Sequence, residues 1–152
     1  RFLSRARELE EHLGPVLWQL PPNWHRNAER LRQFIGVVPD DIEHVFEFRD
    51  EDWFADEIME VLEQGSAGFC THDMGGIEVP RRAIGALAYV RFHGMDGKYQ
   101  GRYSDEAIGD WADWLADQHE QGRSIYAYFN NDAEGHAPRD AIRLRTALRD
   151  RL

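Results

Sequence analysis

Five short apolar runs, most of them separated by helical segments, constrain the fold of this chain more than any other feature of the sequence. The runs are rich in β-branched and aromatic residues, and glycine or proline lies close to most of them, as is typical of strands. Strands that alternate with helices favour a parallel sheet with right-handed crossovers. The runs cover residues 15–20, 43–49, 67–73, 87–94 and 124–130.

Helical patterns fill most of the intervals between the runs. One begins after Ser104, a good N-cap residue that Asp105 and Glu106 follow at the positive end of the helix. The last begins at Pro138, and the segment 74–85 is an exception with little helical pattern. With no linker in view, we expect residues 1–152 to form a single domain. The predicted helices cover residues 1–12, 28–35, 53–64, 105–121 and 138 onward.

Side-chain alternation places polar residues on one face of the predicted sheet. Successive side chains of a strand point to opposite faces, and a sheet covered by helices on both sides is apolar on both. Here one face repeatedly carries polar side chains: Gln19, Glu47, Arg49, Arg91, His93 and Asn130. The simplest geometry is a barrel whose inward face lines a polar mouth, where ligands of such folds bind. The alternative is a structural ion-pair network, such as Glu47 with Arg91, that plugs the barrel.

Two loops add candidate ligand-binding residues. The segment 93–103 is rich in glycine and carries Lys98 and Arg102, which suits an anion, although it matches neither a Walker loop nor GxGxxG. The segment after the last strand holds Asn130, Asn131 and Asp132, which suit substrate orientation or a metal but also the capping of a helix. The first loop is either an anion-binding loop or a surface loop with glycine turns, and the second either binds a ligand or caps a helix; both alternatives stay open for each loop.

Composition excludes several classes of protein. The net charge of −10 argues against broad, non-specific nucleic-acid binding. No run approaches ~18 consecutive apolar residues, so no membrane span is expected. Cys70 is the one cysteine, so an intrachain disulfide is excluded, and this fits a reducing cytoplasm. We interpret Cys70 as a small buried residue.

Six segments of the chain carry a distinctive pattern: GPVLWQLPP at 14–22, VFEFRD at 45–50, HD at 72–73, YVRFHG at 89–94, KYQGRY at 98–103 and YFNND at 128–132. Together they resemble the YecE-like family, a domain of unknown function with a TIM-barrel-like fold. The resemblance covers nearly the whole chain in the order of the family's motifs.

The resemblance implies an α/β fold, a partial TIM (β/α)8-like barrel of about five parallel strands with flanking helices. The five strands would be strands four to eight, because nothing like the family's N-terminal Gly-Thr-Ser-Gly-Trp-like motif is present. The chain would then be the C-terminal part of such a barrel, with two open edges. We therefore expect a homo-oligomer, or a missing N-terminal half that completes the barrel.

The first functional hypothesis is an enzyme that binds an anionic or phosphate-bearing small molecule or a nucleotide. Glu47, His93 and Asn130 are the candidate catalytic residues, the first two as acid or base. The candidate ligand-binding residues are Gln19, Arg49, Arg91, Lys98, Tyr99, Arg102, Tyr103, Asn131 and Asp132.

The alternatives belong to other classes. A metal-dependent hydrolase or nuclease would use Glu47, His72, Asp73 and His93, with Asp132 as a further ligand, but no tight ligand spacing supports a metal and the inward arginines would repel one. A non-catalytic binding module and a purely structural fragment also remain. The sequence identifies no cofactor.

Overall fold

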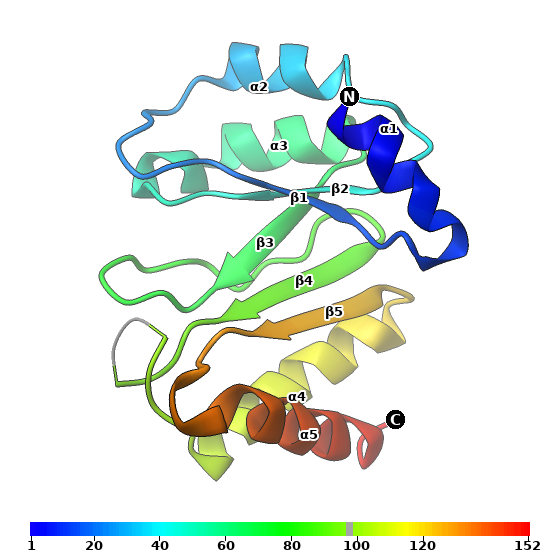
Figure 1. Ribbon diagram of the computed structural model, residues 1–152. Coiled ribbons are helices and arrows are strands. Elements are labelled where there is room, and N and C mark those ends of the chain that lie inside the picture. The colour runs from blue at the N-terminus through cyan, green and yellow to red at the C-terminus, as the bar shows by residue number, and fades with distance from the viewer. Residues whose placement is uncertain (97–98) are drawn as a thin grey trace.

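All five predicted strands pair in parallel, in the order in which they occur along the chain, β1-β2-β3-β4-β5. The computed structural model describes residues 1–96 and 99–152. The sheet is curled into a half-barrel (Figure 1), so the expected partial TIM-barrel-like fold is confirmed. The strands are β1 (Val16–Gln19), β2 (His44–Glu47), β3 (Gly68–His72), β4 (Leu87–Phe92) and β5 (Ser124–Phe129), each within its predicted range.

Helices connect all the strands except β3 and β4, and they cover one side of the sheet. Helices α2 and α3 lie over the first half of the sheet, and α4 and α5 over the second half (Figure 1). The α-helices are α1 (Phe2–Ala6), α2 (Ala28–Ile35), α3 (Asp56–Gln64), α4 (Asp105–Glu120) and α5 (His136–Arg149), with shorter 3-10 helices η1 (Arg7–His12), η2 (Glu51–Phe54) and η3 (Ala133–Gly135). In the described part of the chain no helix is long and apolar enough to cross a membrane.

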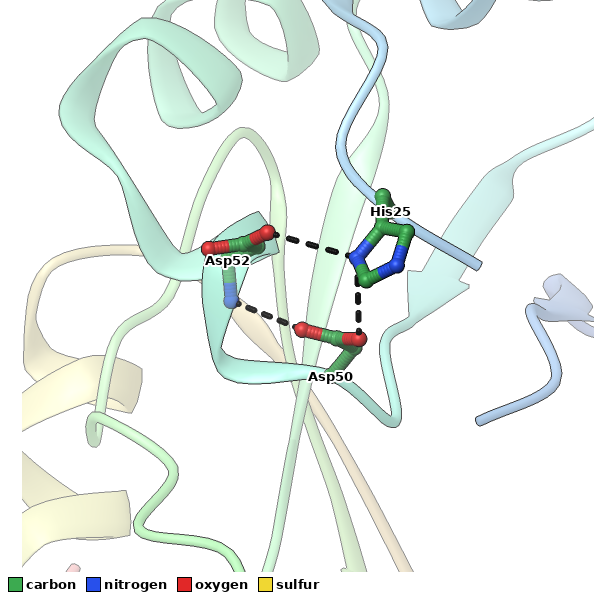
Figure 2. A group of neighbouring side chains, drawn as sticks. All are labelled: His25, Asp50 and Asp52. Carbon is green, nitrogen blue, oxygen red and sulfur yellow. Dashed lines mark hydrogen bonds and ion pairs between the residues drawn. The ribbon is translucent and has the colours of Figure 1, made fainter. Parts of the chain in front are cut away.

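Three predicted helices differ from the observed ones. The predicted helix 1–12 is divided into α1 and the 3-10 helix η1, and Glu10 within η1 has a φ of 48°. Neither piece buries a residue that would hold a continuous helix together. The predicted helix 53–64 begins only at Asp56, because Asp50 accepts a hydrogen bond from the Asp52 backbone N–H and forms the separate turn η2 (Figure 2). Helix α5 begins two residues before Pro138, which its first turn tolerates because N–H groups there lack intrahelical acceptors.

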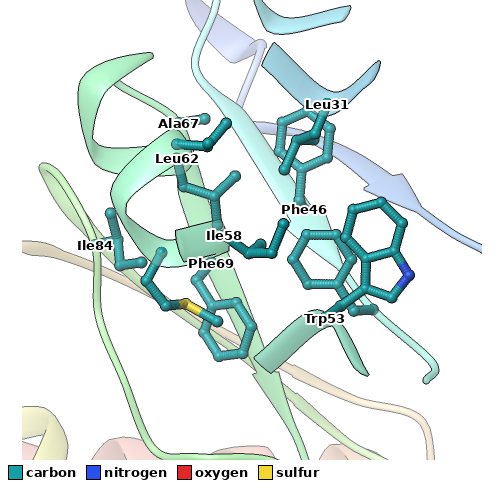
Figure 3. Packing of buried hydrophobic residues seen from close by; sticks show 11 residues of the cluster. Leu31, Phe46, Trp53, Ile58, Leu62, Ala67, Phe69 and Ile84 are labelled. Atoms are coloured by element: carbon teal, nitrogen blue, oxygen red, sulfur yellow. The ribbon is translucent and has the colours of Figure 1, made fainter. Parts of the chain in front are cut away.

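The convex face of the sheet forms the main core. Phe46 and Phe69 pack against Ile58 and Leu62 of α3 (Figure 3). Phe48 belongs to the same cluster. A second cluster joins β4 and β5 to α4 and α5, and within it the rings of Phe92 and Phe129 stack with their centroids 4.3 Å apart. These apolar clusters fix the strands from outside, so the opposite, concave face is left for other side chains.

The concave face changes from apolar to polar along the strands. Near their amino ends Val45, Cys70, Leu87 and Tyr89 form a small buried cluster. Beyond it, toward the carboxyl ends, the side chains are charged or amide-bearing. Parallel strands end on the same side, so these polar groups gather in one place, which we call the mouth.

Candidate functional site

A buried carboxylate between two arginines lies at the centre of the mouth. Glu47, the last residue of β2, is 0% exposed. Its Oε2 accepts a hydrogen bond of 2.6 Å from Arg91 Nη1, and its Oε1 forms an ion pair with Arg49 Nη2. Gln19 Oε1 accepts from both guanidinium groups, at 3.2 Å from Arg91 and 3.5 Å from Arg49. We call these four residues the arginine cluster, and its formal charge is positive.

Hydrogen bonds and neighbouring charges keep Glu47 and Arg91 of the arginine cluster ionised. Burial acts to raise the pKa of Glu47, but the hydrogen bond from Arg91 and the charges of Arg49 and Arg91 outweigh it and hold the pKa below its ordinary value of 4.5. Burial likewise acts to lower the pKa of Arg91, and its hydrogen bond to Glu47 reverses that effect and raises the pKa. Glu47 is therefore an anion that already accepts from an arginine, which is a poor starting point for a general base.

His93 lies beside the arginine cluster and is 1% exposed. Its Nε2 lies 3.3 Å from Arg49 Nη2 and 3.5 Å from Asn130 Nδ2, both of which are donors. Nε2 must therefore accept, which assigns the ring proton to Nδ1. Nδ1 lies 3.7 Å from Asp73 Oδ1, so a carboxylate faces the protonated side of the ring. The accepting nitrogen is directed at Arg49 and Asn130.

Two hydrogen-bond donors hold the Asp73 carboxylate in place. Its Oδ1 accepts from the His93 backbone N–H at 2.6 Å, and its Oδ2 accepts from the hydroxyl of Tyr103. Burial, followed by the charge of Asp73, raises the pKa of Tyr103, so this hydroxyl keeps its proton and donates. The Tyr103 oxygen in turn accepts from the Gly94 backbone N–H at 2.8 Å. Gly94 has a φ of +104°, and a Cβ there would collide with the Gln100 backbone, so only glycine fits this turn.

A cavity of about 280 Å³ opens beside the arginine cluster. Arg49 belongs to both, since its guanidinium contacts Glu47 and its side chain lines the cavity. The Arg49 Nε is buried and has no hydrogen-bond partner in the described part of the chain. A buried donor without a partner is unfavourable, so a ligand oxygen that reaches it gains a hydrogen bond. The lining residues are Gln19, Pro22, Arg49, Met74, Gly75, Gly76, Ile77 and Tyr99.

The other predicted ligand-binding residues lie in different surroundings. Asn131 is 0% exposed and donates to Gly101 O at 2.9 Å and to the buried Asp140 at 2.8 Å. The carbonyl of Asp132 accepts from Gly135 N in the turn before α5. Arg102 lies 3.5 Å from Asp105 at the start of α4. These contacts are those of loop and helix-end residues.

Two further predicted ligand-binding residues, Lys98 and Tyr99, belong to the loop 93–103. Lys98 lies outside the described residues. Tyr99 lines the cavity, and its ring centroid lies 5.8 Å from that of His93.

The predicted metal ligands are not brought together as a set. Both nitrogens of His72 are used inside the protein: Nε2 donates to Phe48 O at 2.8 Å, and Nδ1 accepts from Met74 N at 3.4 Å. Among the described residues, His25, Asp50 and Asp52 form the one group whose potential ligand atoms all lie within 4.8 Å of one another (Figure 2). His25 also lines a larger cavity of about 760 Å³ between β1 and α2, on the other face of the sheet.

Sequence reasoning missed two contributors to the mouth. The lining segment from Met74 to Ile77 was recognised only as a connection without helical pattern, and no motif marks it. Asp140 is 0% exposed and accepts from the Tyr103 backbone N–H at 3.1 Å, which fixes the loop that carries Tyr103. Its buried role follows from tertiary packing, and an acidic residue near the beginning of a helix gives no signal of it.

Comparison with known proteins identifies the family and supports the fold. The family model described as "Protein of unknown function DUF72" matches residues 1–152. A crystal structure of a DUF72 family protein from Thermotoga maritima MSB8 is 22% identical, with a TM-score of 0.85 over 97% of this chain and 64% of that chain. Two crystal structures of a DUF72 family protein from Enterococcus faecalis V583 are each 17% identical, with TM-scores of 0.83 and 0.79 over 97% of this chain and 64% and 66% of theirs.

The comparison with curated proteins found no match. The chain spans 64% of the length of the Thermotoga protein. The structural likeness, at these identities, concerns the fold, whereas the family model covers the complete chain of 152 residues. The sequence resemblance is therefore confirmed, and this chain belongs to the DUF72 family, which is also called YecE.

Proposed function

We propose that the mouth binds a small anionic molecule, most simply a phosphate-bearing one, and that His93 exchanges a proton with it. The observation that carries the proposal is the pairing of two guanidinium groups with a single buried carboxylate. One positive charge is left over next to the cavity. Arginine suits this task because its planar array of donors matches phosphate and carboxylate oxygens.

Arg49 is the central residue of this proposal. Its side chain is 7% exposed, so a ligand that reaches it is largely removed from water and the interaction is strengthened. Its Nε supports the proposal further, because that donor lacks a partner within the described part of the chain. Gln19 contacts both guanidinium groups and lines the same cavity.

Glu47 and His93 have different roles in the proposal. The prediction that Glu47 is a catalytic base stays untested, and its contacts favour the positioning of Arg49 and Arg91. His93 offers an accepting Nε2 next to Arg49 and Asn130, with Asp73 behind the ring. This arrangement suits an acid or base that acts on a ligand held by the arginines. The position at the carboxyl ends of barrel strands supports the proposal by analogy of fold alone.

Isothermal titration calorimetry with orthophosphate and pyrophosphate tests the proposal. The expected result is saturable binding of at least one of these anions to the wild-type chain. Arg49→Lys keeps the charge but loses the geometry of the guanidinium, and we expect it to weaken binding by about 10-fold or more, the worth of one charge-assisted hydrogen bond.

Arg82→Gln is the matched control, because Arg82 pairs with Asp56 on the exposed surface at 3.0 Å. This variant should bind the anion as the wild-type chain does. Absence of anion binding by the wild-type chain, or equal losses in both variants, would contradict the proposal.

A further inference from the structure

Three tyrosines form an aromatic strip along the concave face of the sheet. Tyr89 of β4 stacks on Tyr128 of β5, with ring centroids 5.1 Å apart and planes 30° apart. Tyr89 also stacks on Tyr126, with centroids 6.1 Å apart. The three residues share a face with Arg91, because strand residues two apart point the same way. The strip therefore continues from the buried floor of the concave face to the mouth.

Exposure is uneven along the aromatic strip. Tyr89 is 5% exposed, whereas Tyr128 is 43% exposed. Its strand neighbours Ala127 and Phe129 pack into the cluster on the convex side, which fixes the backbone beneath it. A single exposed aromatic ring is common on protein surfaces, so its exposure alone indicates nothing. Tyr128 is of interest for ligand binding because a charged residue, Arg91, is its neighbour on β4.

Tyr128 and Arg91 are direct neighbours across the sheet. They are register partners in the parallel pairing of β4 and β5, and neighbouring strands of a sheet lie about 4.8 Å apart. Arg91 is the arginine whose Nη1 contacts both Glu47 and Gln19. An exposed, pre-ordered ring thus lies on the strand next to the one that carries Arg91 of the proposed anion site, whose guanidinium extends toward β2 and β1.

We infer that the ligand of the mouth carries a planar aromatic group that stacks on Tyr128 while its anionic group binds Arg49 and Arg91. The class of ligand is then an aryl phosphate or a nucleoside phosphate, and a compact anion or a sugar phosphate fills only part of the site. This inference rests on the proposed function, since the arginines hold the anionic end. Tyr128 is ordered by Tyr89 before the ligand arrives, so little rotamer freedom is lost on stacking.

Calorimetry with two matched probes, ribose 5-phosphate and adenosine monophosphate, tests the inference. Both carry one phosphate on a ribose, and only the second carries an aromatic base. The wild-type chain should bind adenosine monophosphate about 10-fold more tightly or better, the typical gain from one base stacked on an aromatic side chain. Tyr128→Ala should remove this advantage and leave the affinity for ribose 5-phosphate unchanged. Tyr128→Phe should keep the advantage, because the ring remains.

Two further variants keep the test decisive. Trp24→Ala removes an aromatic side chain of similar exposure, 54%, that lines the cavity between β1 and α2, and should leave the ratio of the two affinities unchanged. Tyr128→Leu, with apolar bulk and no ring, replaces Tyr128→Ala if that variant fails to fold. Equal affinities for the two probes in the wild-type chain would overturn the inference and leave anion binding standing. So would a ratio of affinities that neither Tyr128→Ala nor Tyr128→Leu alters. Failure of both probes and of pyrophosphate to bind would overturn the proposed function itself.

Discussion

Glu47 is the residue on which the concave face of the sheet depends most. It is fully buried and lies between Arg49 and Arg91, and removal of its charge leaves two largely buried guanidinium groups without their partner. Glu47→Gln should therefore lower the free energy of unfolding by about 3–5 kcal/mol, measured by urea denaturation. Glu29→Gln is the control, because Glu29 pairs with Arg32 on the exposed surface of α2 and should change little. Equal stability of the wild-type and Glu47→Gln chains would contradict this account.

The same residue makes the stability depend on pH. The pKa of Glu47 in the folded chain lies below the ordinary 4.5 expected of the unfolded chain, so the unfolded state binds the proton more tightly. Its contribution to stability is complete above pH 4.5 and is lost as the pH falls through the folded pKa. Urea denaturation between pH 6 and pH 3 should show a steeper decline for the wild-type chain than for Glu47→Gln. Parallel curves would show that Glu47 does not contribute in this way.

At the residue scale, alternation along the strands was enough to predict much of the mouth. It placed Glu47, Arg91 and His93 on one face. In the structure Glu47 contacts Arg91 and Arg49, and Arg49 contacts His93. It could not decide between a base and an ion-pair partner for Glu47, because that depends on where two flexible arginine side chains end. It also could not find Asp140, whose burial is set by the packing of the loop 93–103.

At the scale of the elements, local sequence signals predict the start of one helix correctly and fail to predict the break in another. Helix α4 begins at Asp105 as predicted, because Ser104 accepts a hydrogen bond from the Ala107 backbone N–H at 3.0 Å. The predicted N-terminal helix is broken instead, since propensity without a buried face does not hold a short helix together.

The cap of α4 gives a test at this scale. Ser104→Ala should lower the free energy of unfolding by about 1 kcal/mol, because the Ala107 N–H loses its acceptor. Ser104→Asp restores an acceptor and adds a charge that suits the helix N-terminus, so it should recover the loss. Thermal unfolding of the three chains measures the effect. A Ser104→Ala chain that unfolds with the wild-type chain would show that the cap is not what starts α4.

At the scale of the whole molecule, the half-barrel has two open edges, β1 and β5. The five-stranded parallel sheet and its helices were predictable because strands and helices alternate along the sequence. The alternation does not predict what covers the two edges, because the unpaired backbone groups of an edge strand can pair with any strand of matching register. We propose that this chain of 152 residues associates with a second copy through these edges.

Sedimentation equilibrium tests the association. The chain has a mass of 17.7 kDa, and a homodimer should sediment with twice that mass at micromolar concentration. Replacement of Ala127 in β5 by proline removes one backbone donor from this edge strand and should lower the dimer fraction. A wild-type chain that stays at 17.7 kDa up to its solubility limit would contradict the proposal.

The central claim, that the arginines of the mouth bind an anion, is tested most directly by crystals of the chain soaked in tungstate, whose tungsten atom scatters anomalously. The account predicts an anomalous peak within hydrogen-bond reach of the guanidinium groups of both Arg49 and Arg91, with the Arg49 Nε among the donors. It also predicts that the peak disappears in crystals of Arg49→Lys. Tungstate bound elsewhere on the protein, with a mouth that stays empty at every concentration, would contradict the claim and leave the arginine cluster with a structural role alone.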